Sequence, residues 1–243
     1  MKRSHNEDSF GVMDSHHLYV VADGMGGHAS GEVASRMAIE TLRDFFAATA
    51  NDPEATWPYK MDKSRGYEEN RLITGIKLAN LRIYEAQQRD PKLRGMGTTI
   101  VAALVVDEGV LIGHVGDSRV YRLRDGKLEQ LTEDHSLLND YIKMKKLSEE
   151  EIRNFPHKNV IVRALGMKDH VKVDTLLDQP HTGDVYVLCT DGLSGPVSDE
   201  EIRATLEGAS DLRNALEKLI ARANENGGPD NITCVLLKVI GVG

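Results

Sequence analysis

The sequence predicts an α+β fold in which antiparallel β-sheets are covered on their outer faces by helices. Long helical patterns and blocks of strand patterns follow one another along the chain, and most neighbouring strands are joined by short connections. Because helix and strand do not alternate regularly, a parallel doubly wound sheet is disfavoured. An Asp125-Gly126 pair between two strand patterns strengthens this prediction, since Asp-Gly is a typical two-residue hairpin turn.

The first third of the chain predicts a hairpin and two long helices. Weak apolar alternation on both sides of a Ser-His-His turn indicates the hairpin, whereas apolar residues at helical spacing indicate the helices. Two prolines and the only tryptophan interrupt the pattern between the helices. The expected ranges are 9–22 for the hairpin, 30–46 for the first helix, 51–66 for the loop and 72–86 for the second helix, which ends near Asp90-Pro91.

The remainder predicts strands interrupted by one charged insertion and followed by two helices. Capping boxes, Ser148-x-x-Glu151 and Ser198-x-x-Glu201, mark two helix starts. We expect strands at 98–106, 110–115, 119–123, 127–131, 159–165, 171–176, 184–190 and 231–240, a helical insertion at 134–158, and helices starting at 198 and covering 212–223.

Composition narrows the class of protein. With 243 residues, 40% of them apolar, we expect one domain spanning 1–243. A net charge of −8 disfavours nucleic acid or an anionic membrane as the main partner. The longest apolar run, 100–106, is too short to span a membrane. Cys189 and Cys234 lie in apolar strand patterns, so we expect free thiols, no disulfide and a cytoplasmic location.

Four aspartates stand beside Gly or Asn residues that border apolar runs. They are Asp23, Asp117, Asp191 and Asp230, and Asp8 lies near the start of the chain. An aspartate beside a glycine is usually a turn, so each occurrence alone is weak evidence. Together, carboxylates at the ends of several strands predict an oxygen-rich site for a hard divalent cation such as Mg²⁺ or Mn²⁺.

The ordered set of motifs is much more specific than any one of them. The set comprises Arg3-x-x-Asn6-Glu7-Asp8, Asp23-Gly-Met-Gly-Gly-His28, Gly97-Thr-Thr99, Gly116-Asp-Ser-Arg119, Thr190-Asp-Gly192 and Gly228-Pro-Asp-Asn231. With these motifs the sequence resembles the metal-dependent serine/threonine protein phosphatases of type 2C, in their compact bacterial form, over roughly residues 3–240. The resemblance implies two antiparallel sheets packed as a β-sandwich with helices on both sides, in α-β-β-α layers.

The resemblance also implies a two-cation site that hydrolyses phosphoserine and phosphothreonine in phosphoproteins. Asp23 would bridge two Mn²⁺ or Mg²⁺ ions, the Gly24 carbonyl would complete one of them, and Asp191 and Asp230 would hold the other. Shared carboxylates suit such a pair, because two divalent ions repel unless anionic oxygen lies between them. A water bridging the cations would attack phosphorus.

Supporting roles follow from the same resemblance. Glu7 and Asp8 would orient metal-bound waters, and Asp117 would help Asp191 hold a third, weaker ion. The planar guanidinium of Arg3 would bind two phosphate oxygens. We expect phosphorylated proteins as substrates, a bacterial Ser/Thr kinase as the opposing enzyme, and a monomer.

The sequence departs from the family pattern at two points. Many eukaryotic relatives have a histidine directly after the Asp-Gly pair, proposed as the general acid, but Met25 stands there. His28 is an alternative general acid; a helix-entry histidine bound to a loop carbonyl explains it equally well. Relatives also usually have a further strand before the Arg3 motif, so we expect an edge strand to be missing.

Two histidines and the charged insertion have weaker assignments. His114 lies in a strand pattern and is more typical of a core histidine than of a ligand, and His135, within a family-like Asp-His-Ser segment, is expected to order a turn. The insertion at 134–158 resembles the flap beside the active site of the bacterial enzymes. We expect it to be mobile and to influence substrate choice, although a solvated helical face is the simpler interpretation.

Three other classes of protein fit less well. A phosphoprotein-binding pseudophosphatase would be expected to have lost one of the acids at 23, 191 and 230. A structural calcium protein would carry its acids in one short loop. A different metallohydrolase would usually bring a His pair at ligand spacing, such as His-x-x-x-His, and the sequence has none.

Overall fold

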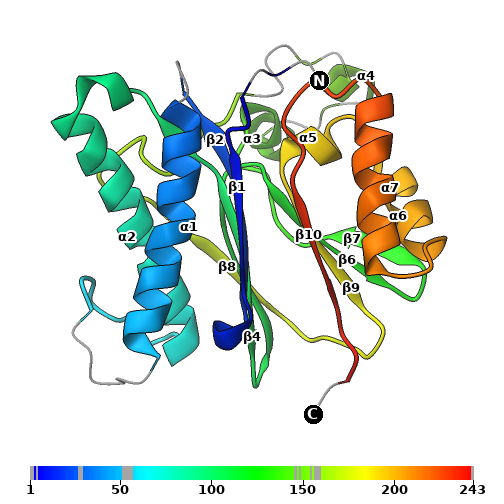
Figure 1. The fold of residues 1–243 in the computed structure, drawn as a ribbon, viewed down its shortest axis with the longest axis horizontal. Helices are drawn as coiled ribbons and strands as arrows, with labels where there is room; N and C mark the ends of the chain where they lie inside the picture. Colours follow the sequence, from blue (N-terminus) through cyan, green and yellow to red (C-terminus); the bar gives the residue numbers. More distant parts are fainter. Residues whose placement is uncertain are drawn as a thin grey trace.

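The protein, described here from a computed structural model, consists of two antiparallel sheets between two pairs of helices (Figure 1). The structure describes residues 3, 5–26, 30–50, 57–144, 147, 149–153, 155 and 160–241. The first sheet contains β1 (Asp8–Met13), β2 (Leu18–Met25), β4 (Ile100–Val106), β5 (Gly109–Val115) and β8 (Asp174–Asp178) in that order, and the two-residue β3 (Gly97–Thr98) pairs with β2. The second contains β10 (Cys234–Lys238), β9 (Val185–Cys189), β6 (Arg119–Arg124) and β7 (Lys127–Gln130).

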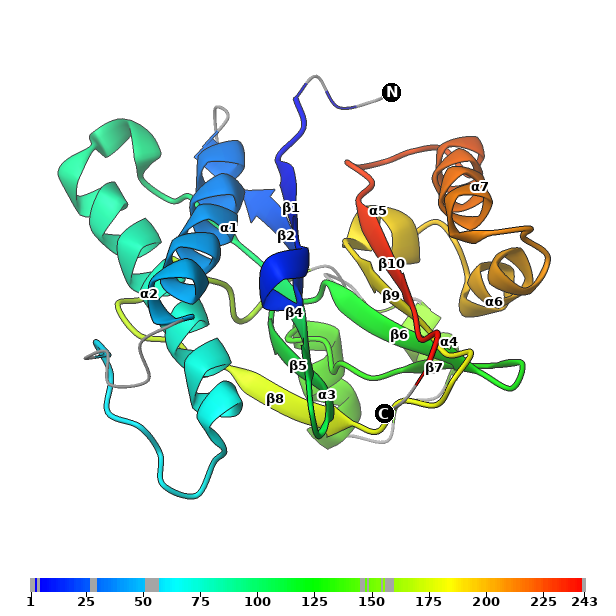
Figure 2. The same ribbon diagram turned by 60° about the horizontal axis from the view of Figure 1, so that its bottom comes forward.

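The long helices lie on opposite sides of the sandwich, as Figures 1 and 2 both show. The first sheet is covered by α1 (Ser30–Thr49) and α2 (Tyr67–Arg89), and the second by α5 (Asp191–Ser194), α6 (Asp199–Glu207) and α7 (Leu212–Glu225). The short 3₁₀ helices are η1 (Asp14–His16) and η2 (Pro91–Leu93).

Strand alternation divides the apolar side chains into three cores. In β2, Val20 and Ala22 pack with the helices α1 and α2, whereas Val21 lies in the core between the sheets. In β9, Val187 packs with the helices on the other side, whereas Leu188 faces the first sheet. Because side chains of a strand point to opposite faces in turn, both sheets bury both faces. The predicted α-β-β-α layering is therefore confirmed.

Most predicted elements are found, but two strand predictions need correction. Residues 160–165 form no strand and make only the isolated bridges Ser136–Ile161 and Thr98–Leu165. Their β-branched residues reach no continuous neighbouring strand, and Val160 and Val162 remain exposed. The strand predicted at 171–176 is β8, which begins and ends slightly later, and the single turn α5 was not predicted.

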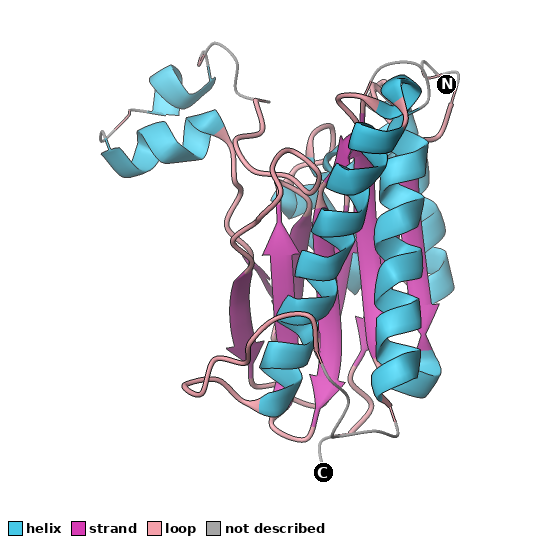
Figure 3. Cartoon of the chain, turned by 90° about the vertical axis from the view of Figure 1, so that its left-hand side faces the viewer, coloured by secondary structure: helices cyan, strands magenta, loops and turns pink. Residues whose placement is uncertain are grey.

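The charged insertion forms α3 (Leu137–Met144) and α4 (Glu149–Arg153). These two short helices stand away from the sheets in Figure 3. The first capping residue predicted here, Ser148, lies outside the described residues, whereas the second box is present, with Ser198 and Glu201 bonding each other's backbone N–H. Within the described part of the chain, none of the helices combines the length and apolar character that a membrane span requires.

Candidate active site

The fold brings the five aspartates together: each lies at or beside the end of a strand, and the charges of the other four all act on Asp23. Asp8 and Asp23 are directly opposed in the β1–β2 pair. The three others lie beside strand ends: Asp117 just after β5, Asp191 at the start of α5 directly beyond β9, and Asp230 before β10. The negative charges of Asp8 and Asp191 both act on Asp23 and raise its pKa.

Electrostatics shows how closely these carboxyl groups are gathered. Burial raises the pKa of Asp23 well above its ordinary value, and the charges of Asp8, Asp191, Asp117 and Asp230 raise it further. Burial also raises the pKa of Asp8 to about 6 and that of Asp117 to about 7, with Asp191 adding to both. Burial, followed in size by the charge of Asp230, also raises the pKa of Asp191. The arrangement therefore favours a bound cation over five separate negative charges.

Threonine and serine hydroxyls hold the acid-bearing backbone in place. The Asp23 N–H donates to Thr99 Oγ1 at 3.1 Å, and Thr98 Oγ1 donates to the Asp23 carbonyl at 2.9 Å. Thr99 Oγ1 also lies 2.7 Å from Ser118 Oγ, next to Asp117. This buried network links the strand end at Asp23 to the turn that carries Asp117.

A second network links the N-terminal segment to the later acids. Thr190 Oγ1 donates to Asp8 Oδ2 at 3.0 Å, directly before Asp191. Asn231 Oδ1 accepts the Glu7 N–H at 3.0 Å, directly after Asp230. Segments separated by more than 180 residues are thus joined at the site.

Two glycines permit close backbone approach at the site. A Cβ at Gly24 would lie 2.1 Å from the Gly31 carbonyl oxygen, and the Gly24 N–H donates to the Glu7 carbonyl at 3.1 Å. A Cβ at Gly192 would lie 1.7 Å from the Asn231 carbonyl oxygen. Any larger residue at either position would push apart the segments that carry the acids.

Arg3 lies at the rim of the acidic cluster. Its Nη2 donates to Asp230 Oδ2 at 2.7 Å, and its side chain is 50% exposed. A guanidinium group carries five N–H donors, so this contact leaves others able to bind an incoming anion.

A cavity of about 300 Å³ adjoins the cluster. Asp117, Asp191 and Asp230 line one part of it, and Ser136 and Leu138 of the insertion line another. Arg119 and Asp134 also line the cavity, and they form a two-bond ion pair. Arg119 Nε donates to Asp134 Oδ1 at 3.0 Å and Nη2 donates to Oδ2 at 2.7 Å. A larger hollow of about 650 Å³ lies near Val235 and Val239, but none of the five aspartates lines it.

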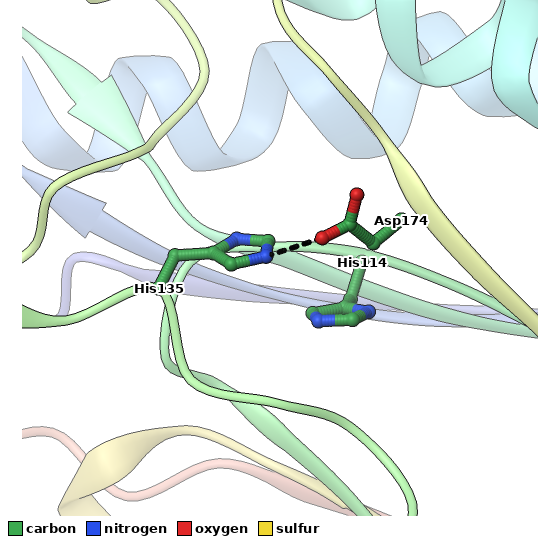
Figure 4. Close-up of side chains that lie close together, drawn as sticks. All are labelled: His114, His135 and Asp174. Atoms are coloured by element: carbon green, nitrogen blue, oxygen red, sulfur yellow. Dashed lines mark hydrogen bonds and ion pairs between the residues drawn. The ribbon is translucent and has the colours of Figure 1, made fainter. Parts of the chain in front are cut away.

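A separate His-Asp group lies close to the Asp117 turn. The ligand-type atoms of His114, His135 and Asp174 are all within 4.8 Å of one another, and the two imidazole rings stack with centroids 4.8 Å apart (Figure 4). Burial and the neighbouring His114 lower the pKa of His135 to about 4, so its ring is neutral at neutral pH.

The structure thus assembles all the predicted site residues that it describes. His28 lies outside the described residues. Thr99, Ser118 and Thr190 stand within the sequence motifs, but the sequence predicts no role for them. It also does not predict the contact between His135 and Asp174. The position of Thr99, Ser118 and Thr190 next to a motif residue is the sequence feature that could have indicated their supporting role. No local feature of the sequence links residues 135 and 174.

The donor set suits hard divalent cations. Several buried or half-buried carboxylates converge with one arginine at the rim, and Asp and Glu oxygens are the ligands that Mg²⁺ and Mn²⁺ prefer. The observation that supports the fit is the convergence of carboxyl groups, with Asp8 opposed to Asp23 and with Asp117, Asp191 and Asp230 lining one cavity.

Comparison with known proteins gives one consistent result. A family model described as Protein phosphatase 2C matches residues 2–237. The serine/threonine phosphatase stp of Listeria monocytogenes is 40% identical over 244 residues, covering 97% of this chain and 91% of the relative. The serine/threonine protein phosphatase PstP of Mycobacterium tuberculosis is 37% identical over 238 residues, covering 98% of this chain and 43% of the longer relative.

Solved structures similar to this chain are also serine/threonine phosphatases. The crystal structure of Mycobacterium tuberculosis PstP/Ppp superposes with a TM-score of 0.85 at 35% identity, covering 99% of this chain and 95% of that one. The catalytic domain of PstP in complex with two manganese ions gives a TM-score of 0.80 at 34% identity, covering 99% and 94%. The motifs, the layered fold and these matches agree: this chain belongs to the protein phosphatase 2C family and is a serine/threonine protein phosphatase.

Proposed function

We propose that Asp23, Asp191 and Asp230 hold two divalent cations in this cluster, with the Gly24 carbonyl as a further ligand. The reaction is metal-dependent dephosphorylation of phosphoserine and phosphothreonine in proteins, with Mn²⁺ or Mg²⁺ as the cofactor. When bound, the cations supply Lewis-acid activation of water and offset negative charge on the phosphoryl group. The observation that carries the proposal is the buried carboxylate cluster centred on Asp23.

The remaining acids have supporting roles in this proposal. Asp117 lines the cavity beside Asp191, which supports its role in a third, weaker cation site. Asp8 accepts a hydrogen bond from Thr190 and faces Asp23, and Glu7 is tied to Asn231 through its backbone. We assign both to the orientation of water around the cations.

Arg3 binds the substrate phosphate in this proposal, since it is the cation at the rim of the site and is half exposed. Binding a phosphate there exchanges part of its contact with Asp230 for two charge-assisted hydrogen bonds. His28 remains our candidate for the general acid that protonates the leaving oxygen.

The insertion at 134–158 is proposed to be the part of a single catalytic domain that selects phosphoprotein substrates. Its residues Ser136 and Leu138 line the cavity that the acids also line. We further propose a monomer that works in the cytoplasm and opposes a bacterial Ser/Thr kinase. The relatives' names as serine/threonine phosphatases support the kinase, and the two free cysteines support a reducing compartment.

Asp191→Asn tests the proposed metal centre. This variant keeps the side-chain volume but removes one negative charge, so hydrolysis of a phosphothreonine peptide with Mn²⁺ should fall on the order of 100-fold or more. Wild-type turnover should vanish with a chelator. Mn²⁺ should also raise the Tm of the wild type more than that of the variant, because a ligand stabilises the folded state more when it binds that state more tightly.

Asp199→Asn is the matched control, since Asp199 is exposed at the start of α6 and does not line the cavity that the acids line. It should behave as the wild type. Wild-type activity in Asp191→Asn would contradict the assignment, and a folded, metal-loaded wild type without turnover would indicate a phosphoprotein-binding role instead.

A further inference from the structure

Three segments that flank the active site meet at one carboxylate. His135 lies at the start of the insertion, Arg163 lies beyond its end, and Asp174 begins β8. His135 Nε2 and Arg163 Nη1 lie 2.9 and 3.0 Å from the same oxygen, Oδ2 of Asp174. Figure 4 shows the His135 ring directed at this carboxylate.

His135 is also hydrogen-bonded to Gly116, through its second ring nitrogen and through its backbone N–H. The Gly116 N–H donates to His135 Nδ1 at 3.0 Å, and the His135 N–H donates to the Gly116 carbonyl at 2.9 Å. Because a buried backbone donor requires an acceptor, the neutral ring must accept at Nδ1 and carry its proton at Nε2. That proton is then donated to Asp174.

Gly116 determines the backbone direction immediately before Asp117. Its φ of +112° is a conformation that residues with a side chain rarely adopt, and a Cβ there would lie 2.6 Å from Thr99 Cβ. Both its N–H and its carbonyl are bound by His135. The backbone immediately before Asp117 is therefore held at both of its polar groups by His135, at the N–H through the imidazole ring and at the carbonyl through the His135 N–H.

A metal ion held by His114, His135 and Asp174 is the competing explanation of the group. His114 Nε2 lies 3.0 Å from the Glu133 carbonyl and must be protonated to bond it, and His135 Nε2 carries the proton described above. The Arg163 guanidinium also lies 3.0 Å from both His135 Nε2 and Asp174 Oδ2. Both ring nitrogens of His135 are used in hydrogen bonds and a cation lies beside Asp174, so His114 Nδ1 would be the one ring nitrogen of the group left for a metal, which is too few for a histidine-held site.

We propose that His135 is a positioning residue for Asp117, with Asp174 and Arg163 holding its ring so that the Gly116 turn presents the Asp117 carboxylate to the weak cation. The inference rests on the proposed third-ion role of Asp117. It also joins both ends of the insertion to the cation site, since His135 lies at its start and Arg163 lies shortly after its end.

Two substitutions separate the contacts of the ring. In His135→Asn the side-chain oxygen lies near the place of Nδ1 and can still accept the Gly116 N–H, whereas His135→Gln extends past Gly116 towards Asp174. His170→Gln is the control, because His170 also pairs with an aspartate, Asp169, but is 83% exposed. Thermal melts establish that each variant is folded.

Two measurements are made on each protein. NMR hydrogen exchange of the Gly116 amide, without metal, reports the contact itself, and calorimetric titration with Mn²⁺ reports the affinity of the weak site. We expect His135→Gln to speed exchange and to weaken the weak site by roughly 10-fold or more, as for other residues that orient a metal ligand. In His135→Asn, both the slow exchange of the Gly116 amide and the Mn²⁺ affinity of the weak site should be close to those of the wild type. His170→Gln should change neither quantity.

Unchanged exchange and unchanged weak-site affinity in His135→Gln would overturn the proposal. Loss of an Mn²⁺ site in His114→Gln, with normal Gly116 exchange, would overturn it in favour of a metal at the histidines. If Asp117→Asn leaves the weak site intact, the third-ion role fails and this proposal fails with it. The two-cation centre is judged separately by Asp191→Asn.

Discussion

At Asp23, burial and four neighbouring carboxylates all act in the same direction. Ionisation without a counter-charge costs free energy there, which is why the pKa values of Asp8, Asp23, Asp117 and Asp191 are all raised. The site is thus least stable when it is empty and fully ionised. A divalent cation removes that repulsion, so metal affinity and folding stability are linked at the level of single residues.

This linkage predicts the pH dependence of the metal-free protein. Asp117 has a pKa of about 7 when folded, against an ordinary value of 3.8, so the folded state binds more protons between these values. The free energy of unfolding must then fall as pH rises through this window. Replacing Asp117 by Asn should make the fall in Tm between pH 5 and 8 smaller by roughly 5–10 °C, since one pKa unit is about 1.4 kcal/mol and about 1 kcal/mol corresponds to roughly 2–4 °C.

Thermal melts with a chelator at several pH values measure this effect. Asp107→Asn, at the exposed turn between β4 and β5, makes the same change in net charge and should retain the wild-type pH dependence. Equal pH dependence in the wild type and in Asp117→Asn would show that Asp117 is not strained by its neighbours.

Among the elements, hairpins and strand ends do most to build the site, and the insertion borders it. The β1–β2 hairpin opposes Asp8 and Asp23, and the β9–α5 junction supplies Asp191. The insertion contributes α3, a helix with exposed Ile142 and Met144, the latter 78% exposed. Large apolar side chains left in water beside an active site indicate a surface that contacts large substrates.

The double substitution Ile142→Ser and Met144→Ser tests that role of the insertion. We expect kcat/KM on a phosphoprotein to fall roughly tenfold or more, because burial of one such side chain is worth about 1.5–3 kcal/mol and about 1.4 kcal/mol is tenfold. Hydrolysis of p-nitrophenyl phosphate should be unchanged, since neither Ile142 nor Met144 lines the cavity beside the acids. Met167→Ser, an exposed methionine outside the insertion, is the control; equal losses on both substrates would contradict the assignment.

At the scale of the whole molecule, buried polar groups join the two sheets at the end opposite the acids. Asp178 of β8 accepts from Arg122 of β6 at 2.5 Å and from Tyr186 of β9 at 2.5 Å. The Arg122 and Asp178 side chains are only 13% and 11% exposed. Because these residues come from both sheets, the cluster fixes how the sandwich is closed.

Asp178→Ala should therefore destabilise the protein strongly without changing catalysis. It leaves a largely buried guanidinium without its nearest carboxylate, and breaking a buried pair in this way costs about 3–5 kcal/mol. Urea unfolding measures the loss, and Glu85→Ala, in an exposed pair with Arg89, should cost less than about 1 kcal/mol. Similar losses in both variants, or a large fall in kcat for a folded Asp178→Ala, would show that the cluster has another role.

The sequence by itself determined the elements and the chemical class of the site. Apolar periodicity located α1, α2 and most strands, and the acids beside Gly or Asn in a fixed order indicated carboxylates gathered at strand ends. These signals are local, because helical and strand periods and turn preferences depend on neighbouring residues. The strand expected at 159–165 was wrong over its described part, 160–165, for the same reason: its composition is strand-like, but it makes only isolated bridges and has no continuous neighbour.

Only the tertiary structure decided which partners those residues have. Sheet register opposes Asp8 to Asp23, and chain topology brings Asn231 to Glu7 and Asp174 to His135. None of these pairs is encoded by spacing, since the residues are separated by 15 to 224 positions and many equivalent donors and acceptors lie between them. Hydrogen bonds and charge interactions act over a few ångströms, so their partners are selected by the packed fold and not by the order of residues along the chain.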